Sequence, residues 1–405
     1  MVWIFALASE IIYLFILFKR LQVPLLDLHQ NSDLFLVLAC LAVLFFIYFS
    51  FYFFTSWKNV NVKKILLISV IFHITFLFVP FLTSDDLYSY IFSSRLLPIW
   101  GANPYIIPFD NFPYDPIYKE IKTIWSSQTV LYGPLFLLVG SGLNLIGQNN
   151  FSLLIYLFKI TLIGANIISS ILVFKLTNSK RALFLYSLNP LIIFELAGNA
   201  HSDSLSILLI LIALLMINKK PVFGYVSLVA SIFIKYFTLL LIPFFSIFVF
   251  RKNLRSFILM LILSIIFTVI IFVPFWNGLD IFNYLTSYYA EASPFPSLGI
   301  LLGTVIFRTY EPSFNINTIF FLGIFVILTI KLLRSDNNLA KLILFSTFLY
   351  WAFVLTKLNL VLTWYLTPII ALSSLCLISK KYSKIGIKSI ILANLYSLFL
   401  YWWVR

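Results

Sequence analysis

Apolar runs of about twenty residues recur from one end of the chain to the other. A run of this length can cross the hydrocarbon core of a bilayer as one helix. Because backbone groups in lipid can pair only with one another, such runs are expected to be α-helical. The chain is also 62% hydrophobic and only 10% charged, whereas a soluble domain is about half apolar and about a quarter charged. The sequence therefore predicts an all-α integral membrane protein, with residues 1–405 forming one polytopic domain.

The apolar runs predict thirteen transmembrane spans. Their approximate limits are residues 2–18, 34–55, 65–82, 152–174, 182–197, 204–217, 221–234, 237–250, 256–275, 315–333, 341–356, 361–378 and 386–403. Two further apolar pieces, 132–147 and 298–308, are too short, or too often interrupted by glycine, to be predicted as transmembrane spans. We expect both to lie on, or dip into, one face of the membrane.

The net charge of +14 is explained by where the basic residues fall. With the N-terminus inside, most of the 28 Lys and Arg lie in inner loops, where Asp336 is the one acidic residue. This pattern obeys the positive-inside rule and predicts a cytoplasmic N-terminus. It also removes the reason to expect a nucleic-acid partner. The opposite face carries two large loops, 83–151 and 276–315, and long loops of this kind are often functional.

The first outer loop opens with two adjacent acids, Asp85 and Asp86. In a purely structural interpretation, Thr83 or Ser84 caps a short helix and the acids occupy its first turn. In a functional interpretation, one acid is a general base, or both bind a divalent cation such as Mg²⁺ or Mn²⁺. Two carboxylates this close should raise one pKa unless a positive charge is near. Arg95 could supply that charge if the loop folds back.

A second polar element contains Asn199, His201 and Asp203. It could simply cap the next helix, or its side chains could close around a phosphate or a sugar. Glu195 precedes it near the outer end of a span, where an acid is costly unless it is paired or hydrated. Lys235 interrupts an apolar run at an outer turn. It could extend to the interface or hold a lipid-linked phosphate as a point charge.

Two aromatic residues, Trp364 and Tyr365, begin an inward-going span. They fit an interfacial aromatic belt, or a platform for a lipid chain or a sugar. Glu10 and Lys159 lie inside apolar spans and could pair with each other or mark a polar path. The chain has no Walker loop, dinucleotide fingerprint or zinc motif, so a nucleotide-sugar site of a standard kind is not indicated.

Several short strings between residues 80 and 250 together carry a family resemblance. They are Asp86-Leu87-Tyr88-Ser89-Tyr90, Gly101-Ala102-Asn103-Pro104-Tyr105, Asp115-Pro116, Tyr132-Gly133-Pro134-Leu135, Asn189-Pro190 and Gly198-Asn199-Ala200-His201-Ser202-Asp203. In this order they resemble the polytopic glycosyltransferases of the GT-C class. The closest likeness is to the bacterial polyprenol-phosphate-mannose-dependent mannosyltransferases of the α-1,6-mannopyranosyltransferase type.

The resemblance implies a GT-C bundle with juxtamembrane helices on the outer face of the cytoplasmic membrane. It implies transfer of a hexose, with mannose expected, from a polyprenyl-phosphate carrier to a glycolipid or glycan hydroxyl. Asp86, with Asp85 beside it, would then be the catalytic acid pair. We expect substrate contacts from Tyr88, Arg95, Asn103, Tyr105, Tyr132, Asn199, His201, Asp203, Lys235, Trp364 and Tyr365.

Elementary chemistry agrees with this expectation. A carboxylate can take the proton of the attacking hydroxyl, and cationic groups or a metal can offset charge on the departing phosphate. Two alternatives stay open at this point. A lipid or polysaccharide transporter or flippase would place paired charges near the midplane, often in two repeated halves. A lipid-linked glycan polymerase would share the outer-face site.

Overall fold

The computed structural model describes residues 2–23, 25–123, 125–130, 132–278, 297–358 and 360–403, with side chains omitted at 307 and 310–312. Within these ranges the regular elements are helices, which confirms the predicted all-α class. The second predicted outer loop, 276–315, falls partly outside this description, because residues 279–296 are not covered.

Seven helices in the described ranges are long and apolar enough to cross a bilayer. They are α1 (Val2–Leu21), α2 (Asn31–Phe54), α7 (Phe151–Thr177), α13 (Leu254–Phe272, extended by η6, Val273–Phe275), α16 (Tyr310–Arg334), α17 (Leu339–Thr356) and α19 (Lys380–Trp403). An eighth span is added if the bent pair formed by 180–187 and 190–198, which meet at 43°, counts as one.

The other predicted spans coincide with shorter or broken helices. These are α3 (Val62–Thr75) with η2 (Phe76–Phe78), α8 (Lys180–Ser187) with α9 (Pro190–Ile192) and the π-helix η4 (Ile193–Gly198), α10 (Asp203–Met216), α11 (Pro221–Ile232), η5 (Tyr236–Leu241) with α12 (Ile242–Phe250), and η7 (Thr363–Leu366) with α18 (Thr367–Leu375) and η8 (Cys376–Ile378). A helix of 14 residues such as α10 is about 21 Å long, which is less than the bilayer core of about 30 Å. The predicted count of thirteen full spans is therefore not confirmed.

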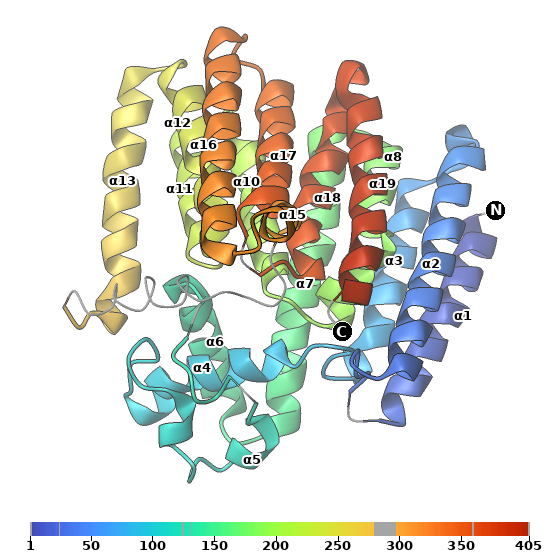
Figure 1. Ribbon diagram of the computed structural model, residues 1–405, viewed down its shortest axis with the longest axis vertical. Coiled ribbons are helices and arrows are strands. Elements are labelled where there is room, and N and C mark those ends of the chain that lie inside the picture. Colours follow the sequence, from blue (N-terminus) through green and yellow to red (C-terminus); the bar gives the residue numbers. More distant parts are fainter. Residues whose placement is uncertain are drawn as a thin grey trace.

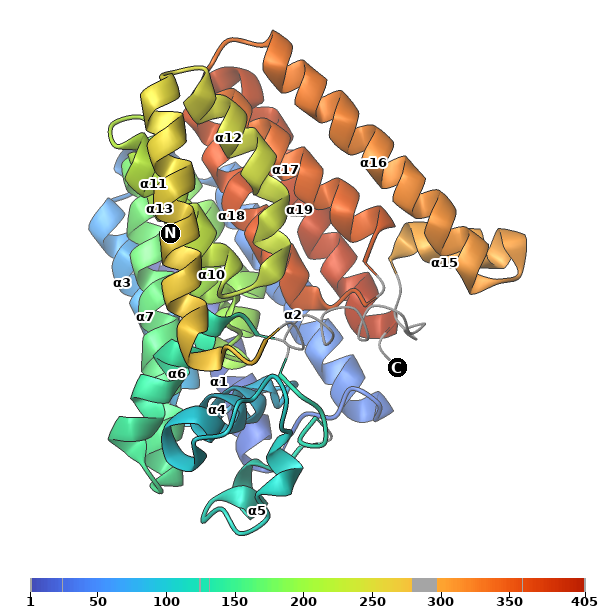
Figure 2. The ribbon, with the colours of Figure 1, turned by 90° about the vertical axis from the view of Figure 1, so that its left-hand side faces the viewer.

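The first predicted outer loop folds into a layer of its own beyond one end of the bundle (Figures 1 and 2). Its helices are α4 (Asp86–Trp100), η3 (Phe109–Asn111), α5 (Tyr118–Ile121) and α6 (Pro134–Gly147). α4 and α6 lie beside the N-terminal end of α7 (Figure 1). α15 (Leu298–Phe307) lies at the end of α16 that faces the same side (Figure 2).

The basic loops meet one another at the opposite end of the bundle. Lys180 Nζ donates to the Lys58 carbonyl at 3.4 Å, which joins the loop after α2 to the loop after α7. Lys252 Nζ donates to Asn218 Oδ1 at 2.7 Å. Arg251 donates to backbone carbonyls at the end of α16 at 3.2 and 2.6 Å. The fold thus gathers the loops that the charge pattern had assigned to one side.

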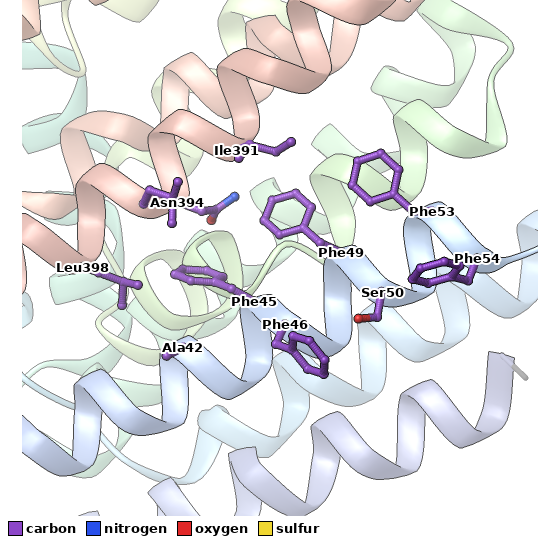
Figure 3. Close-up of a pocket in the computed structure, with 11 residues that line it drawn as sticks. Ala42, Phe45, Phe46, Phe49, Ser50, Phe53, Phe54, Ile391, Asn394 and Leu398 are labelled. Carbon is purple, nitrogen blue, oxygen red and sulfur yellow. The ribbon is translucent and has the colours of Figure 1, made fainter.

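A hollow of about 410 Å³ lies between α2 and α19 (Figure 3). Its lining is almost wholly apolar and includes Phe45, Phe49, Phe53 and Leu398, with Asn394 as one polar member. None of the acids or basic residues singled out in the sequence lines this hollow.

The two charged residues inside apolar spans do not pair with each other. Glu10 accepts a hydrogen bond from the Thr75 hydroxyl, between α1 and α3. Lys159, which is fully buried in α7, donates to backbone carbonyls instead. The alternative in which these two residues form an ion pair is therefore not found.

Candidate active site

The two adjacent acids lie where the chain enters the outer layer. Asp85 occupies the N-cap position of α4 without a side-chain capping bond, and Asp86 is the first helical residue. A carboxylate in this position is favoured by the positive end of the helix dipole. Thr83, which the sequence suggested as a cap, is instead bonded to Asn199.

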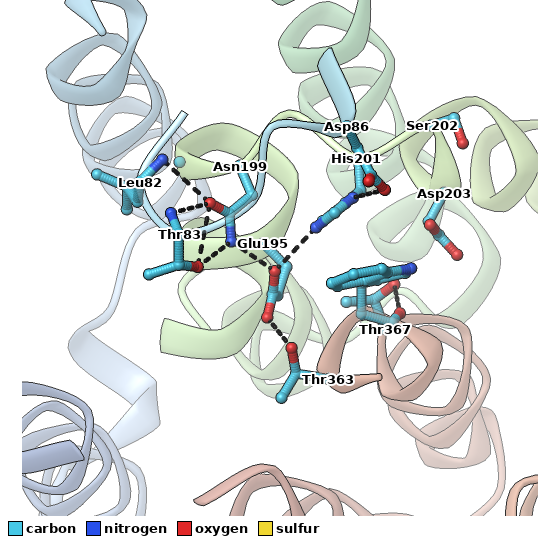
Figure 4. Close-up of polar contacts among 12 residues, drawn as sticks. Leu82, Thr83, Asp86, Glu195, Asn199, His201, Ser202, Asp203, Thr363 and Thr367 are labelled. Carbon is cyan, nitrogen blue, oxygen red and sulfur yellow. Dashed lines mark hydrogen bonds and ion pairs between the residues drawn. The ribbon is translucent and has the colours of Figure 1, made fainter. Parts of the chain in front are cut away.

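The centre of the site is an imidazole between two carboxylates (Figure 4). His201 Nδ1 lies 3.4 Å from Asp86 Oδ2, and His201 Nε2 lies 3.2 Å from Glu195 Oε2. The Nε2 contact is an ion-pair approach rather than an aligned hydrogen bond. His201 and Glu195 are fully buried, whereas the Asp86 side chain is 18% exposed. Asp86 is therefore the member of the three that a substrate can reach.

Glu195 is held by donors from three parts of the chain. The hydroxyls of Thr363 and Tyr401 both donate to its Oε1 atom. Asn199 Nδ2 donates to Oε2 at 2.8 Å. A buried carboxylate is tolerated only when it is paired and hydrogen-bonded, and these contacts satisfy that requirement. They also fix the carboxylate that faces His201.

Asn199 connects the two polar elements seen in the sequence. Its Oδ1 atom accepts from the backbone N–H groups of Leu82 and Thr83 at 3.0 and 2.8 Å. It follows directly after the π-helix η4, which carries Glu195. π-helical turns of this kind are frequent at functional sites. The amide therefore holds the segment before Asp86 against the segment that carries Glu195 and His201.

Aromatic side chains enclose the imidazole. Trp364 stacks on His201, with ring centroids 3.9 Å apart and an interplanar angle of 26°. The Tyr90 hydroxyl lies 3.5 Å from His201 Nδ1 and accepts from the Ser202 backbone N–H at 3.2 Å. Tyr132 packs edge-on against Tyr90, with centroids 4.8 Å apart. These rings keep water away from the buried side of His201.

A second charged pair lies on the other side of the same segment. Lys235 Nζ forms a salt bridge with Asp203 Oδ2, and the lysine side chain is 13% exposed while the aspartate is fully buried. The ammonium also lies over the Tyr365 ring, 4.9 Å from its centroid. Among the described residues, Asp203 Oδ1 has no hydrogen-bond partner. Asp203 is the first residue of α10, after Ser202 at the N-cap.

The surroundings of His201 and of Asp85 raise the pKa of each group. Burial alone lowers the pKa of His201, but the neighbouring carboxylates of Asp86 and Glu195 outweigh it and raise the pKa to about 9. His201 is therefore an imidazolium at neutral pH. Burial, together with the charge of Asp86, raises the pKa of Asp85 to about 6, as expected for adjacent acids.

Arg95 is not brought to the acids. Because α4 is continuous from Asp86 to Trp100, Arg95 lies about 13.5 Å along the helix axis from Asp86. Its Nε atom pairs with Asp115 Oδ2 at 2.7 Å, and both side chains are fully buried. Arg95 also donates to Gln148 O and Asn149 Oδ1, at 2.5 and 2.6 Å. The predicted fold-back does not occur, and this guanidinium holds the outer layer together.

Three other predicted contact residues support the outer layer rather than surround His201. Tyr88 packs its ring between Phe81 and Phe151. Asn103 Nδ2 donates to the Phe275 carbonyl at 2.7 Å. The buried Tyr105 donates its hydroxyl to the Tyr132 carbonyl at 2.8 Å.

The candidate metal ligands predicted from the sequence are the two adjacent acids. In the part of the chain that is described, no group of three or more His, Cys, Asp or Glu is arranged to hold a metal ion. Mg²⁺ often uses only one or two carboxylates together with water and substrate phosphates. Asp85 and Asp86 could serve as such a partial ligand set.

Sequence reasoning missed part of the site. Glu195 was noted as a costly acid but was not expected beside His201. Tyr90, Thr363 and Tyr401 were not singled out for binding. Tyr401 is 206 residues from its partner Glu195, and no local pattern marks it. Tyr90 could have been found, because it lies four residues after Asp86 and therefore on the same helix face.

The comparisons with known proteins agree on one family. A family model described as "Alpha-(1->6)-mannopyranosyltransferase, N-terminal domain" matches residues 18–251. Three curated relatives carry related names. "Alpha-(1->6)-mannopyranosyltransferase A" of Corynebacterium glutamicum is 28% identical over 152 residues, which cover 36% of this chain and 31% of the relative.

The protein of the same name from Mycobacterium tuberculosis is 26% identical over 182 residues, which cover 43% of this chain and 34% of the relative. A "Probable alpha-(1->6)-mannopyranosyltransferase" of Mycolicibacterium smegmatis is 29% identical over 146 residues, covering 33% and 25%. The chain thus spans about a third or less of the length of these relatives. No solved structure matches the chain. Asp86, Glu195 and His201 fall inside the matched family region, and Trp364 and Tyr401 fall outside it.

Proposed function

The chain belongs to the alpha-(1->6)-mannopyranosyltransferase family, and from this premise we propose that it is a membrane glycosyltransferase that transfers mannose. The donor is a polyprenyl-phosphate sugar and the acceptor is a hydroxyl of a glycan or glycolipid. The single observation that carries the proposal is the partly exposed Asp86 carboxylate beside the buried His201–Glu195 pair. An acid arranged in this way can act on a hydroxyl group at the edge of the bilayer.

In the proposed reaction, Asp86 is the general base. The acceptor oxygen attacks C1 of the sugar while its proton passes to the Asp86 carboxylate. The bond between C1 and the phosphate oxygen breaks, and the electron pair leaves with polyprenyl phosphate. Asp86 acts as the carboxylate in this step, and His201 Nδ1 lies 3.4 Å from its Oδ2 atom. A positioned base of this kind contributes about 10²- to 10⁴-fold to a rate.

Positive charge for the departing phosphate would come from Lys235. Its ammonium is 13% exposed, and Asp203 and the Tyr365 ring hold it at the same polar face. Groups that are fixed before the reaction stabilise developing charge without having to reorganise. A divalent cation at Asp85 and Asp86 is the second source of charge that we propose to test, with the donor phosphate completing its ligands.

We propose that the site faces the outside of the cytoplasmic membrane. The basic loops meet at the end of the bundle opposite the outer layer, and the positive-inside rule assigns that end to the cytoplasm. The N-terminus would then be cytoplasmic, because α1 and α2 are joined at the outer end. A lipid-linked donor suits this geometry, since its phosphate lies at the interface.

The transporter alternative receives less support. It requires paired charges near the midplane, yet Glu10 and Lys159 do not pair. Asp86, Glu195, His201 and Asp203 instead lie close together (Figure 4). A glycan polymerase would use the same acid and base chemistry, and it would differ by repeated transfer to one acceptor.

The test is sugar transfer by purified protein in nanodiscs with radiolabelled polyprenyl-phosphate mannose and mannoside or glycolipid acceptors. We expect labelled product from the wild type and from Glu120→Gln, an exposed acid of α5. We expect product to fall at least about 100-fold in Asp86→Asn. Persistent product in Asp86→Asn would reject Asp86 as the base, and a loss in Asp85→Asn would then identify the base.

Two further arms of the same assay complete the test. Loss of transfer with EDTA, restored by Mg²⁺ or Mn²⁺, would support a cation at the acid pair, and retention would leave Lys235 and His201 as the cationic groups. Absence of product with mannose, glucose and arabinose donors, in protein shown to be folded, would reject the transferase proposal. Lipid or solute movement without a new covalent bond would then support a transporter.

A further inference from the structure

Two segments that carry the site residues converge on one buried ammonium group. Lys159 Nζ donates to the carbonyls of Phe76 and Val79 at 2.5 and 2.6 Å. It also donates to the Gly198 carbonyl at 3.3 Å. The first two carbonyls belong to the segment that leads to Asp86, and the third belongs to the end of η4, just before Asn199. Lys159 itself lies in α7 and belongs to neither segment.

This arrangement is unusual for a lysine inside a bundle. The side chain is fully buried, and three carbonyl acceptors match the three donors of an ammonium group. No carboxylate forms a salt bridge with it in the described ranges. Removing a charge from water is expensive, so a neutral side chain would serve better if only volume had to be filled. What the Lys159 amino group adds is hydrogen bonds to three backbone carbonyls, which an apolar side chain could not form.

The same two segments define the distance between Asp86 and His201. Asn199 Oδ1 accepts hydrogen bonds from the N–H groups of Leu82 and Thr83. The two segments therefore also meet at residues that lie closer to Asp86 in the chain than Phe76 and Val79 do. Arg20 Nε donates to the Phe81 carbonyl at 2.6 Å. The segment before Asp86 is thus held at successive peptide groups, and Lys159 holds the first of them.

We propose that Lys159 is a positioning residue, whose ammonium fixes the segment carrying Asp86 against the segment carrying Glu195 and His201. This inference rests on the proposed function for its catalytic meaning. The Asp86–His201 contact is 3.4 Å, and a displacement of about 1 Å at a catalytic group can cost about 100-fold in rate. Loss of the hydrogen bonds made by Lys159 should therefore reduce turnover more than it reduces donor binding.

The test compares Lys159→Met, which keeps the length and removes the donors, with Lys159→Gln, which keeps two N–H donors without the charge. Lys175→Met is the matched control, because Lys175 is an exposed lysine at the other end of α7. The first readout is the ¹⁵N chemical shifts of the His201 ring at one fixed pH, by solid-state NMR of ¹⁵N-histidine-labelled protein in nanodiscs. The chain has only 3 His, and His201→Gln identifies the signal.

In Lys159→Met we expect the His201 Nδ1 signal to shift from its wild-type position, because the 3.4 Å contact with Asp86 is lost. We expect kcat for transfer to fall about tenfold or more while the KM for the donor changes less than about threefold. Lys159→Gln should lie between this variant and the wild type, and Lys175→Met should match the wild type. If Lys159→Met does not fold, Lys159→Gln carries both readouts.

Unchanged His201 ring signals in a folded Lys159→Met or Lys159→Gln variant would overturn the inference. So would an equal loss of kcat and donor affinity that Lys159→Gln does not relieve, because that result indicates only general destabilisation. The NMR readout needs no turnover. If the wild type transfers no sugar, the proposed function fails while the effect of Lys159 on the Asp86–His201 geometry is still measured.

Discussion

At the scale of single residues, Asp85 and Asp86 are neighbours with different environments. Asp86 faces His201, whereas burial, together with the charge of Asp86, raises the pKa of Asp85 to about 6. Of the two acids, Asp86 lies beside the buried ring of His201. This difference, which the sequence could not provide, is the physical reason to assign the base to Asp86.

His201 gives a pH dependence whose sign follows from its raised pKa. Its folded-state pKa of about 9 exceeds the ordinary value of 6.5. The imidazolium therefore contributes stability that is complete below about pH 6.5 and is lost as the pH rises through about 9. We expect transfer to decline above about pH 9, because the neutral imidazole no longer supports the charge of Asp86.

The measurement is a pH–rate profile of kcat/KM in nanodiscs. His201→Gln should be slower and should lack the alkaline decline, whereas His29→Gln, at an exposed histidine, should keep it. A wild-type rate that stays level to pH 10, or an alkaline decline that survives in His201→Gln, would contradict the assignment.

At the scale of elements, the start of α6 is docked on the end of α11. Gly133 N–H donates to the Ile234 carbonyl at 3.3 Å, and Phe136 N–H donates to the Phe233 carbonyl at 3.1 Å. A Cβ atom at Gly133 would lie 2.2 Å from the Phe233 carbonyl oxygen. The glycine therefore permits a close backbone contact directly before Lys235.

We expect Gly133→Ala to destabilise the protein by about 1–3 kcal/mol, because the backbone contact must open. Transfer should also fall, since the turn that carries Lys235 moves with it. Gly142→Ala is the control in the same helix, because nothing lies within 4 Å of its added Cβ. Thermal unfolding midpoints in nanodiscs check the prediction, and equal midpoints for the two variants would show that the contact has no energetic role.

At the scale of the whole molecule, the basic loops and the candidate active site lie at opposite ends of the bundle. Single cysteines at Tyr114, which is 65% exposed in the outer layer, and at Lys58, in the loop after α2, can test this arrangement in oriented membrane vesicles. The native Cys40 and Cys376 are buried and should react slowly. A membrane-impermeant thiol reagent should label Tyr114→Cys from outside and Lys58→Cys only after permeabilisation. The reverse pattern would invert the proposed orientation.

Much of this architecture could be predicted from local sequence. Hydrophobicity and charge act over single runs and loops, so they predicted the positions of the helices and the grouping of the basic loops. They did not predict which helices are long enough to cross, because breaks such as η4 and η5 depend on neighbouring packing. Asp86, His201, Asp203 and Lys235 could be identified as candidates because polar residues are rare in so apolar a chain.

The sequence by itself therefore determined the class of protein, the grouping of its basic loops and most of the polar residues of the candidate site. Only the tertiary structure decided their partners. It joined Glu195 to Tyr401 across 206 residues, buried Arg95 against Asp115 and directed Lys159 to three backbone carbonyls. The physical reason is that burial makes each charged group take whatever partner the packing brings within reach, and packing joins residues whose separation along the chain no local pattern records.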